Sequence, residues 1–127
     1  MSLVESQVKR GARASNRTNT PVKVDLKVSK ISYDIDYEVG KLRVLPSFVL
    51  NVASEAGSED TSHLLIAASF ALDYLIEPAA EFPDDSLQAF AATNGVFNAW
   101  PYWREYVQNT CVRMGLPAIT VPVFRIA

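Results

Sequence analysis

Only a few residues of this chain have side chains suited to catalysis or metal binding. The chain contains one histidine, His63, and one cysteine, Cys111. His63 falls at the start of a predicted strand beside a polar loop, where a solvent-exposed strand end is the simpler interpretation. Cys111 falls within the apolar stripe of a predicted helix, which is typical of a small core residue rather than a nucleophile. One histidine and one cysteine do not make a metal-ligand cluster, and the sequence has no glycine-rich phosphate loop.

Two acidic pairs are the remaining candidates for chemistry. Asp34 and Asp36 alternate with apolar residues on a predicted strand, so we expect them to lie on its solvated face. Asp84 and Asp85 stand where a helix begins, where a carboxylate can cap the first turn and interact favourably with the helix dipole. We therefore expect no enzyme activity, no catalytic residue, no metal and no cofactor.

Aromatic residues are concentrated in one short segment. Five of the thirteen lie between positions 97 and 106. They are Phe97, Trp100, Tyr102, Trp103 and Tyr106. One helix face cannot bury all five. Core filling is the simpler interpretation for Trp103 and suits Phe97 as well, whereas Trp100, Tyr102 and Tyr106 are equally open to a surface role, because aromatic side chains combine a large contact area with a low ordering cost.

Alternation of apolar and polar residues predicts the strands. Even positions are apolar over residues 22–28 and odd positions over 31–39, so we expect a bulge at Ser29-Lys30 that restores one apolar face. Gly40-Lys41 is the predicted turn. The next strand spans 42–53, and its Pro46 favours an edge position or a bulge there.

The predicted strand 63–76 is apolar on both faces. One face includes Phe70, and the other carries mostly small residues. That second face consists of Leu65, Ala67, Ser69, Ala71 and Leu75. Its small side chains would allow close approach of a second sheet or subunit, so we predict a homo-oligomer whose interface includes Leu65, Ala67, Ser69 and Ala71.

Two helices are predicted after the strands. The first runs from Asp84 or Asp85 to about Thr93 and ends at Asn94-Gly95. The second begins near Pro101 and ends before Gly115. Its core stripe consists of Trp103, Val107, Cys111 and Met114.

Strands followed by helices predict an α+β fold: a four-stranded antiparallel sheet with two C-terminal helices on one face. The whole chain, 1–127, is expected to form one domain. Its predicted parts are a weakly patterned N-terminal strand and loop (1–20), the sheet (22–76), the helices (84–114) and an extended tail (115–127).

Composition favours a cytoplasmic protein that neither inserts into membranes nor binds nucleic acid. Apolar residues make up 49% of the chain, and the longest apolar stretch is far shorter than the roughly 20 residues of a membrane span. No signal peptide is recognisable at the start. Residues 1–30 carry a net charge of +5. Lysines on a strand face are typical of a protected sheet edge, and no aromatic or glycine motif accompanies them.

The aromatic segment and the residues that follow it resemble the SecB family of protein-export chaperones. The stretch Trp100-Pro101-Tyr102-Trp103-Arg104-Glu105 is similar to the family's aromatic-Pro-Tyr-x-Arg-Glu helix start. Gly115-Leu116-Pro117 and Val121-Pro122-Val123 are similar to its Gly-x-Pro helix exit and Pro-Val tail. The alternating stretch from Val22 to Leu26 resembles its first long strand.

This resemblance implies a sheet followed by two helices, assembly into dimers or tetramers, and an apolar groove that holds unfolded or precursor polypeptides for export without ATP. The residues expected to bind such clients are Phe70, Phe97, Trp100, Tyr102 and Tyr106. Arg104 and Glu105 are expected to fix the helix start or to join the subunit interface.

Two departures from the family pattern shape the alternatives. The chain ends at Arg125-Ile126-Ala127 without an acidic tail, so docking on the translocation motor through such a tail is not expected. The basic segment 1–30 is also unusual for an acidic chaperone. Both departures suit a SecB-like subunit dedicated to one partner, such as an antitoxin. A small-ligand-binding domain, suggested by the aromatic residues alone, is a third hypothesis.

Overall fold

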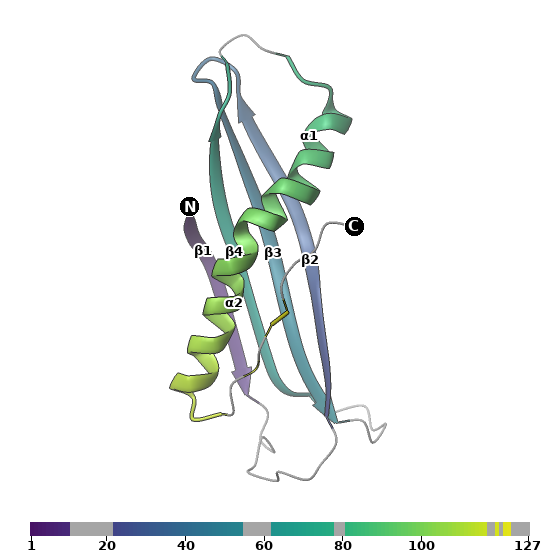
Figure 1. Cartoon of the computed structure of the whole chain (residues 1–127), viewed down its shortest axis with the longest axis vertical. Helices are drawn as coiled ribbons and strands as arrows, with labels where there is room; N and C mark the ends of the chain where they lie inside the picture. The colour runs from purple at the N-terminus through teal and green to yellow at the C-terminus, as the bar shows by residue number, and fades with distance from the viewer. Residues whose placement is uncertain (11–21, 55–61, 78–80, 117–118, 120, 123–127) are drawn as a thin grey trace.

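The chain folds into two layers, a sheet and a long helical segment that crosses one of its faces (Figure 1). The computed structural model describes residues 1–10, 22–54, 62–77, 81–116, 119 and 121–122. The elements in chain order are β1 (Ser2–Arg10), β2 (Val22–Asp36), β3 (Lys41–Ser54), β4 (Ser62–Leu75), α1 (Asp84–Phe90), the π-helical η1 (Ala91–Gly95) and α2 (Val96–Arg113). The strands are ordered β1-β4-β3-β2, and every neighbouring pair is antiparallel. The predicted α+β fold is confirmed.

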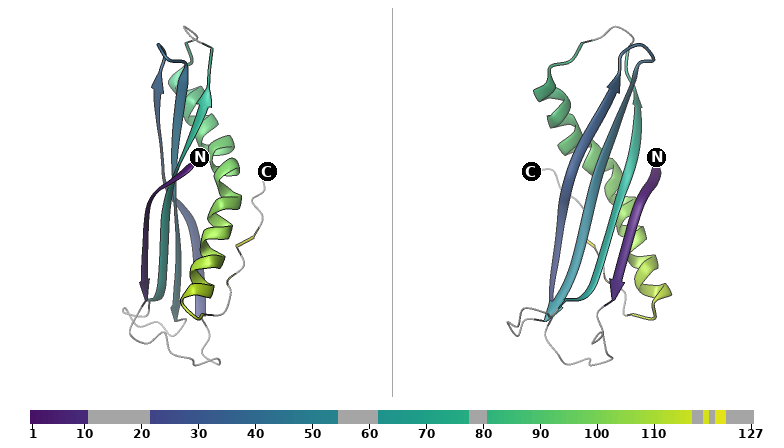
Figure 2. Two further views of the ribbon diagram at one scale, coloured as in Figure 1. Left: turned by 90° about the vertical axis from the view of Figure 1, so that its left-hand side faces the viewer. Right: turned by 180° about the vertical axis from the view of Figure 1, so that it is seen from behind.

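The side views show that the helical segment covers only one face of the sheet (Figure 2). This face, called the inner face below, carries the apolar rows of β2, β3 and β4. The opposite, outer face has no helix on it among the described residues. Phe48 of β3 and Ile66 of β4 are both 0% exposed on the inner face. Phe48 stacks on Trp103 of α2 with ring centroids 5.4 Å apart.

The change of parity within β2 is confirmed as a bulge. Pairing with β3 shifts register between Val28 and Lys30. As a result Val28 and Ile31 both pack on the core from the inner face. The following turn ends at Gly40, whose φ of 76° lies in the left-handed region that glycine adopts without strain. Val39, predicted as the last apolar residue of the strand, instead lies in this turn and is exposed.

The predicted edge position of Pro46 is wrong. β3 lies between β2 and β4, and Pro46 pairs with Ile31. On the β4 side the paired positions pass from Val44↔Leu72 to Ser47↔Ser69 without a shift of register. A proline lacks the N–H that a ladder needs, and here its ring is fully buried in the core.

The two predicted helices form one continuous helical segment, so the predicted break at Asn94-Gly95 is wrong. Gly95 has a helical φ of −61°. A Cβ at this position would lie 2.6 Å from Cγ1 of Val44. Glycine is therefore present because the helix approaches β3 closely, not because the helix ends. Pro101, predicted to start a second helix, lies inside α2.

Neither Asp84 nor Asp85 caps the start of α1. Pro83 occupies the N-cap position and no side-chain cap bond is formed. Asp84 and Asp85 lie in the first turn, where their charge suits the helix dipole. Asp84 also accepts a hydrogen bond from Gln88 Nε2 at 3.2 Å. The predicted electrostatic role fits this position, whereas the capping role is corrected.

Candidate functional site

The helical segment leaves part of the inner face of β2 uncovered. It runs diagonally, so that α1 and η1 contact β2, whereas α2 contacts β3 and β4 (Figure 1). The first half of β2 therefore has less cover from the helical segment than β3 and β4 have. Its inner-facing residues form what we call the β2 strip. The β2 strip consists of Val24, Leu26, Val28 and Ile31, the last of which also packs against the core formed with Leu87 of α1 and Ala91 of η1.

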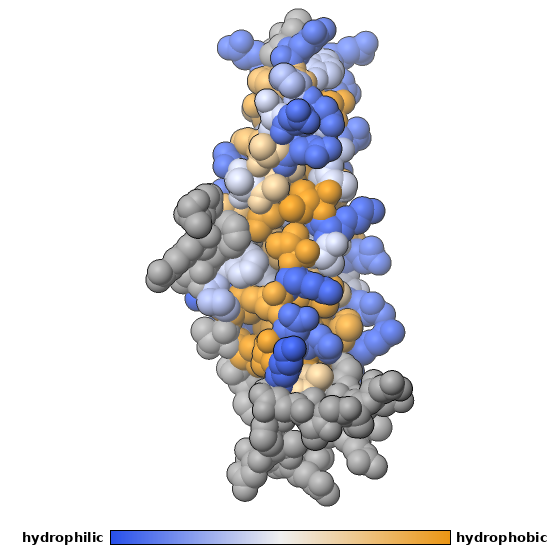
Figure 3. Space-filling view, turned by 90° about the vertical axis from the view of Figure 1, so that its right-hand side faces the viewer, coloured by the Kyte–Doolittle hydropathy of each residue, from blue (hydrophilic) through white to orange (hydrophobic). Residues whose placement is uncertain are grey.

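The β2 strip is an apolar surface that solvent can reach. Val24 is 48% exposed, and Leu26, Val28 and Ile31 are half-buried. Viewed from the side of β2, apolar residues gather along the middle of the molecule, with polar residues among them and along one border (Figure 3). A continuous exposed apolar surface of this kind is typical of a contact site for another polypeptide.

A short piece of the C-terminal segment lies alongside α2 (Figure 1). Val121 is 2% exposed and belongs to the main core, and Ile119 packs against it. Trp100 Nε1 donates a hydrogen bond to the carbonyl oxygen of Pro122 at 2.6 Å. Arg104 Nε donates to the carbonyl oxygen of Val121 at 2.8 Å. Arg104 and Val121 also line a shallow hollow with Gln108 and Ile119.

The five predicted client-binding aromatic residues do not form one surface. Phe70 is 4% and Trp100 is 9% exposed, so both are core residues in this conformation. Tyr106 is half-buried against Trp103, at a centroid distance of 6.4 Å. Phe97 and Tyr102 are about half exposed, at 49% and 50%. Their predicted contacts with clients stay predictions, and only Phe97 and Tyr102 offer half their surface to solvent.

The predicted interface residues divide between two sides of the molecule. Leu65, Ala67 and Ser69 are partly exposed on the outer face of β4, and Ala71 is buried there. Arg104 instead lies on α2 and holds the C-terminal segment, and Glu105 is exposed beside it. Arg104 and Glu105 therefore do not share a surface with the four residues of β4.

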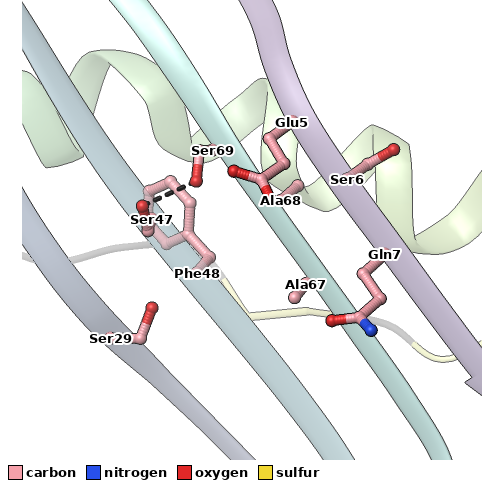
Figure 4. Close-up of a pocket in the computed structure, with 9 residues that line it drawn as sticks. All are labelled: Glu5, Ser6, Gln7, Ser29, Ser47, Phe48, Ala67, Ala68 and Ser69. Carbon is pink, nitrogen blue, oxygen red and sulfur yellow. Dashed lines mark hydrogen bonds between the residues drawn. The ribbon is translucent and has the colours of Figure 1, made fainter.

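A shallow hollow lies at the centre of the outer face and is lined by small polar side chains (Figure 4). The hydroxyl oxygens of Ser47 and Ser69 lie 2.7 Å apart. Glu5 and Gln7 of β1 border this hollow on one side, and Ser29 of the β2 bulge lies on the other.

Asp73 forms ion pairs with Arg43 and Lys41 near one end of the outer face. Arg43 Nε donates to Asp73 Oδ1 at 2.7 Å, and Lys41 Nζ lies 3.4 Å from Asp73 Oδ2. The hydrogen bond from Arg43, aided by both positive charges, lowers the pKa of Asp73 to about 2. The pair is exposed to solvent, so its contribution to stability is small.

The predicted roles of the single cysteine and histidine can be compared with the structure only in part. Cys111 is 0% exposed in the stripe with Trp103 and Val107, which confirms its position in the core. His63 lies in β4, but its side chain is outside the described residues. Within the part of the chain that the structure describes, no three His, Cys, Asp or Glu residues come together as metal ligands. No helix among these residues is long and apolar enough to cross a membrane.

Comparison with curated proteins gave two related chaperones of Mycobacterium tuberculosis. SecB-like chaperone MT2006, from strain CDC 1551 / Oshkosh, is 31% identical over 87 residues, covering 65% of this chain and 48% of the relative. SecB-like chaperone Rv1957, from strain ATCC 25618 / H37Rv, is 27% identical over 117 residues, covering 73% of this chain and 64% of the relative. The chain is similar in sequence to these two SecB-like chaperones. It spans between about half and two thirds of the length of these relatives.

The SecB-like fold is confirmed by a solved structure. The chain matches M. tuberculosis Rv1957 SecB-like chaperone with a TM-score of 0.80 and 21% identity, covering 99% of this chain and 88% of that one. In that structure the chaperone is in complex with a ChAD peptide from the Rv1956 HigA1 antitoxin. A scan against models of known protein families found no match.

Sequence reasoning assigned no binding role to the β2 strip or to the C-terminal segment of this chain. The alternation of Val24, Leu26 and Val28 predicts one apolar face of a strand but not whether a helix covers that face. The predicted length of the helices could have indicated an uncovered surface, because one helical layer of this length cannot cover four long strands along their whole extent. The hydrogen bonds of Trp100 and Arg104 have no counterpart in sequence periodicity.

Proposed function

We propose that this protein is a SecB-like chaperone dedicated to one polypeptide partner, such as an antitoxin, and that it binds an extended apolar segment of that partner. The observation that carries the proposal is the β2 strip, an apolar surface beside a segment of this chain that is itself held in place through its carbonyl groups. The relatives support it, since they are named SecB-like chaperones and one is bound to an antitoxin peptide.

The binding energy in this proposal comes from apolar burial. Val24, Leu26 and Val28 would lose their remaining exposure when an apolar segment lies on them. A segment that buried about 1,000 Å² would gain up to roughly 25 kcal/mol before costs. Association and ordering of the segment offset most of this gain. The expected outcome is reversible binding, which suits a chaperone that must release its partner.

A general holdase for protein export is the second candidate. Exposed aromatic residues such as Phe97 and Tyr102 favour it, because they suit many apolar sequences. Delivery of precursors to a translocation motor and a cytoplasmic location stay predictions of this second candidate.

We also propose that the outer face joins two copies of the chain. One row across all four strands reads Glu5, Ser69, Ser47 and Lys30. A two-fold axis between Ser47 and Ser69 would place Glu5 of each copy opposite Lys30 of the other, so the row is complementary to itself. Its small central side chains would allow two sheets to pack at about 10 Å. Assembly into a tetramer would need a further contact.

The two candidate functions are distinguished by a binding panel. Fluorescent 20-residue peptides that tile the HigA1 antitoxin would be titrated against the protein, alongside several unrelated reduced and alkylated proteins. A dedicated chaperone is expected to bind one antitoxin region at least tenfold more tightly than any unrelated chain. Equal affinity for all unfolded chains would favour the general holdase, and binding to none would overturn both.

A matched pair of variants locates the binding surface. Leu26→Ser alters the β2 strip, whereas Lys27→Ser alters the adjacent residue on the outer face. We expect Leu26→Ser to weaken peptide binding by about tenfold, because apolar contact is lost where the peptide lies. Lys27→Ser is expected to leave the affinity unchanged, and an equal loss in both variants would contradict this location.

A further inference from the structure

Residues 121–122 of the C-terminal segment are held by α2 through their backbone, as an extended peptide would be. Two consecutive carbonyl oxygens, those of Val121 and Pro122, accept hydrogen bonds from side chains of α2. Backbone groups in a sheet or helix are normally bonded by other backbone groups. Here the donors are the indole of Trp100 and the guanidinium of Arg104, so the contact depends on the backbone of the segment.

Trp100 and Arg104 are placed to hold an extended chain. They are four residues apart on α2, so their side chains lie on the same face of the helix. Trp100 is anchored by Phe48, at a centroid distance of 5.7 Å. Arg104 is half-buried beside the hollow that Ile119 and Val121 line. Any extended polypeptide carries carbonyl groups at successive residues, so these two donors would serve a chain of another sequence equally well.

One buried side chain supplies the apolar part of the same contact. Val121 is 2% exposed within the core that also includes Trp100 and Trp103. Leu26, Val28 and Ile31 of the β2 strip pack against that same core. A short apolar side chain and two backbone carbonyls are therefore the features by which this site recognises its present occupant.

We propose that the C-terminal segment around Val121 is an internal occupant of the client site, and that an apolar client segment displaces it. Trp100 Nε1 and Arg104 Nε then donate to the carbonyl groups of the client. This inference rests on the function proposed above and adds its regulation: client binding competes with the chain's own segment. The apparent affinity for a client is lowered by the fraction of molecules whose site is already filled.

The test uses the full-length protein and a labelled synthetic peptide that copies residues 115–127. Val121→Asp places a charge where the segment is buried, which should release the segment and free the site. We expect the peptide to bind the Val121→Asp protein about tenfold more tightly than the unchanged protein. The same peptide with Asp in place of Val121 is the control and should bind neither. Equal or absent binding of the unaltered peptide to both proteins would overturn the inference.

A second titration separates this inference from the proposed function. A reduced, alkylated client protein or the tightest antitoxin peptide is titrated against both proteins. Tighter binding to Val121→Asp supports internal competition. Equal or weaker binding leaves the chaperone function standing but shows that the segment is not a competitor. Binding to neither protein overturns the proposed function itself. Val121→Ser serves as a milder second variant, and circular dichroism checks that each protein is folded.

Discussion

The two faces of the sheet belong to the same strands but differ in the size and burial of their side chains. On the inner face, large apolar side chains such as Phe48 and Ile66 are buried under the helical segment. On the outer face, small polar residues such as Ser47 and Ser69 remain partly accessible. The inner face has more apolar area than one diagonal helix covers, whereas the outer face presents small side chains together with apolar residues such as the exposed Leu75, which suits the contact between two copies proposed above. The difference indicates that binding of apolar segments belongs to the margin of the inner face.

Trp103→Ala should have the largest effect, because it opens the centre of the inner face. Trp103 is 0% exposed and stacks on Phe48. We expect the free energy of unfolding to fall by about 3–5 kcal/mol. Tyr102→Ala, one residue away and half exposed, should change it by less than about 0.5 kcal/mol. Urea unfolding of both variants checks this, and similar losses would show that the helix faces are assigned incorrectly.

Tyr106→Ala should weaken client binding more than it weakens folding. Tyr106 is half-buried at the edge of the same stack, beside Trp103. Peptide titration and urea unfolding of the same variant compare the two effects. A loss of stability as large as that of Trp103→Ala, with unchanged binding, would contradict a contact role.

Gly95→Ala tests how closely the helix lies on the inner face. Alanine favours helices over glycine by about 1 kcal/mol, so an isolated helix would gain stability. Here the added Cβ meets Val44 at 2.6 Å, and crowding of this kind costs about 1–3 kcal/mol. We therefore expect a net loss in thermal unfolding. Asn94→Ala, at the neighbouring exposed position, should be neutral or slightly stabilising, and a gain at both positions would contradict the close approach.

Lys30→Glu tests the outer face. It would place Glu5 of one copy opposite an acidic residue of the other, so self-association should weaken by about tenfold. Exchange of both charges, Glu5→Lys with Lys30→Glu, should restore it. Sedimentation velocity at low salt measures the association. A monomer in every case, or no difference among the variants, would exclude this face as the contact.

The smallest effect is expected from the exposed pair of Arg43 and Asp73. The pKa of Asp73 is lowered from 3.8 to about 2, so its stabilising contribution is present above pH 4 and is lost as the pH falls toward 2. Asp73→Asn should lower the urea midpoint slightly at pH 6 and leave it unchanged at pH 2. A difference that persists at pH 2 would show that the charge is not its cause.

Local patterns were sufficient to predict most of the sheet. Parity alone gave the inner and outer rows of β2 and the bulge near Ser29, because a side chain's face is fixed by its position in the strand. The core stripe of α2, with Trp103, Val107 and Cys111, followed from helical spacing in the same way. These features depend on neighbours in the sequence.

The errors have tertiary causes. Gly95 was taken for a helix end, yet it is required by Val44 of a distant strand. The sequence leaves Trp100 equally open to a core or a surface position, and its contacts with Phe48 and the carbonyl group of Pro122 decide for the core. The exposed β2 strip depends on the diagonal path of the helix. Contacts between residues far apart in the sequence decide each case, and alternation and helical spacing carry no information about them.

Site-specific photo-crosslinking at adjacent positions 26 and 27 tests the central claim most directly. A photoreactive amino acid replaces Leu26 on the inner face in one protein and Lys27 on the outer face in the other. Each is irradiated with the tightest-binding labelled peptide. We predict a crosslinked product from position 26 and little from position 27. Strong crosslinking from position 27, or none from position 26, would contradict the assignment of client binding to the β2 strip.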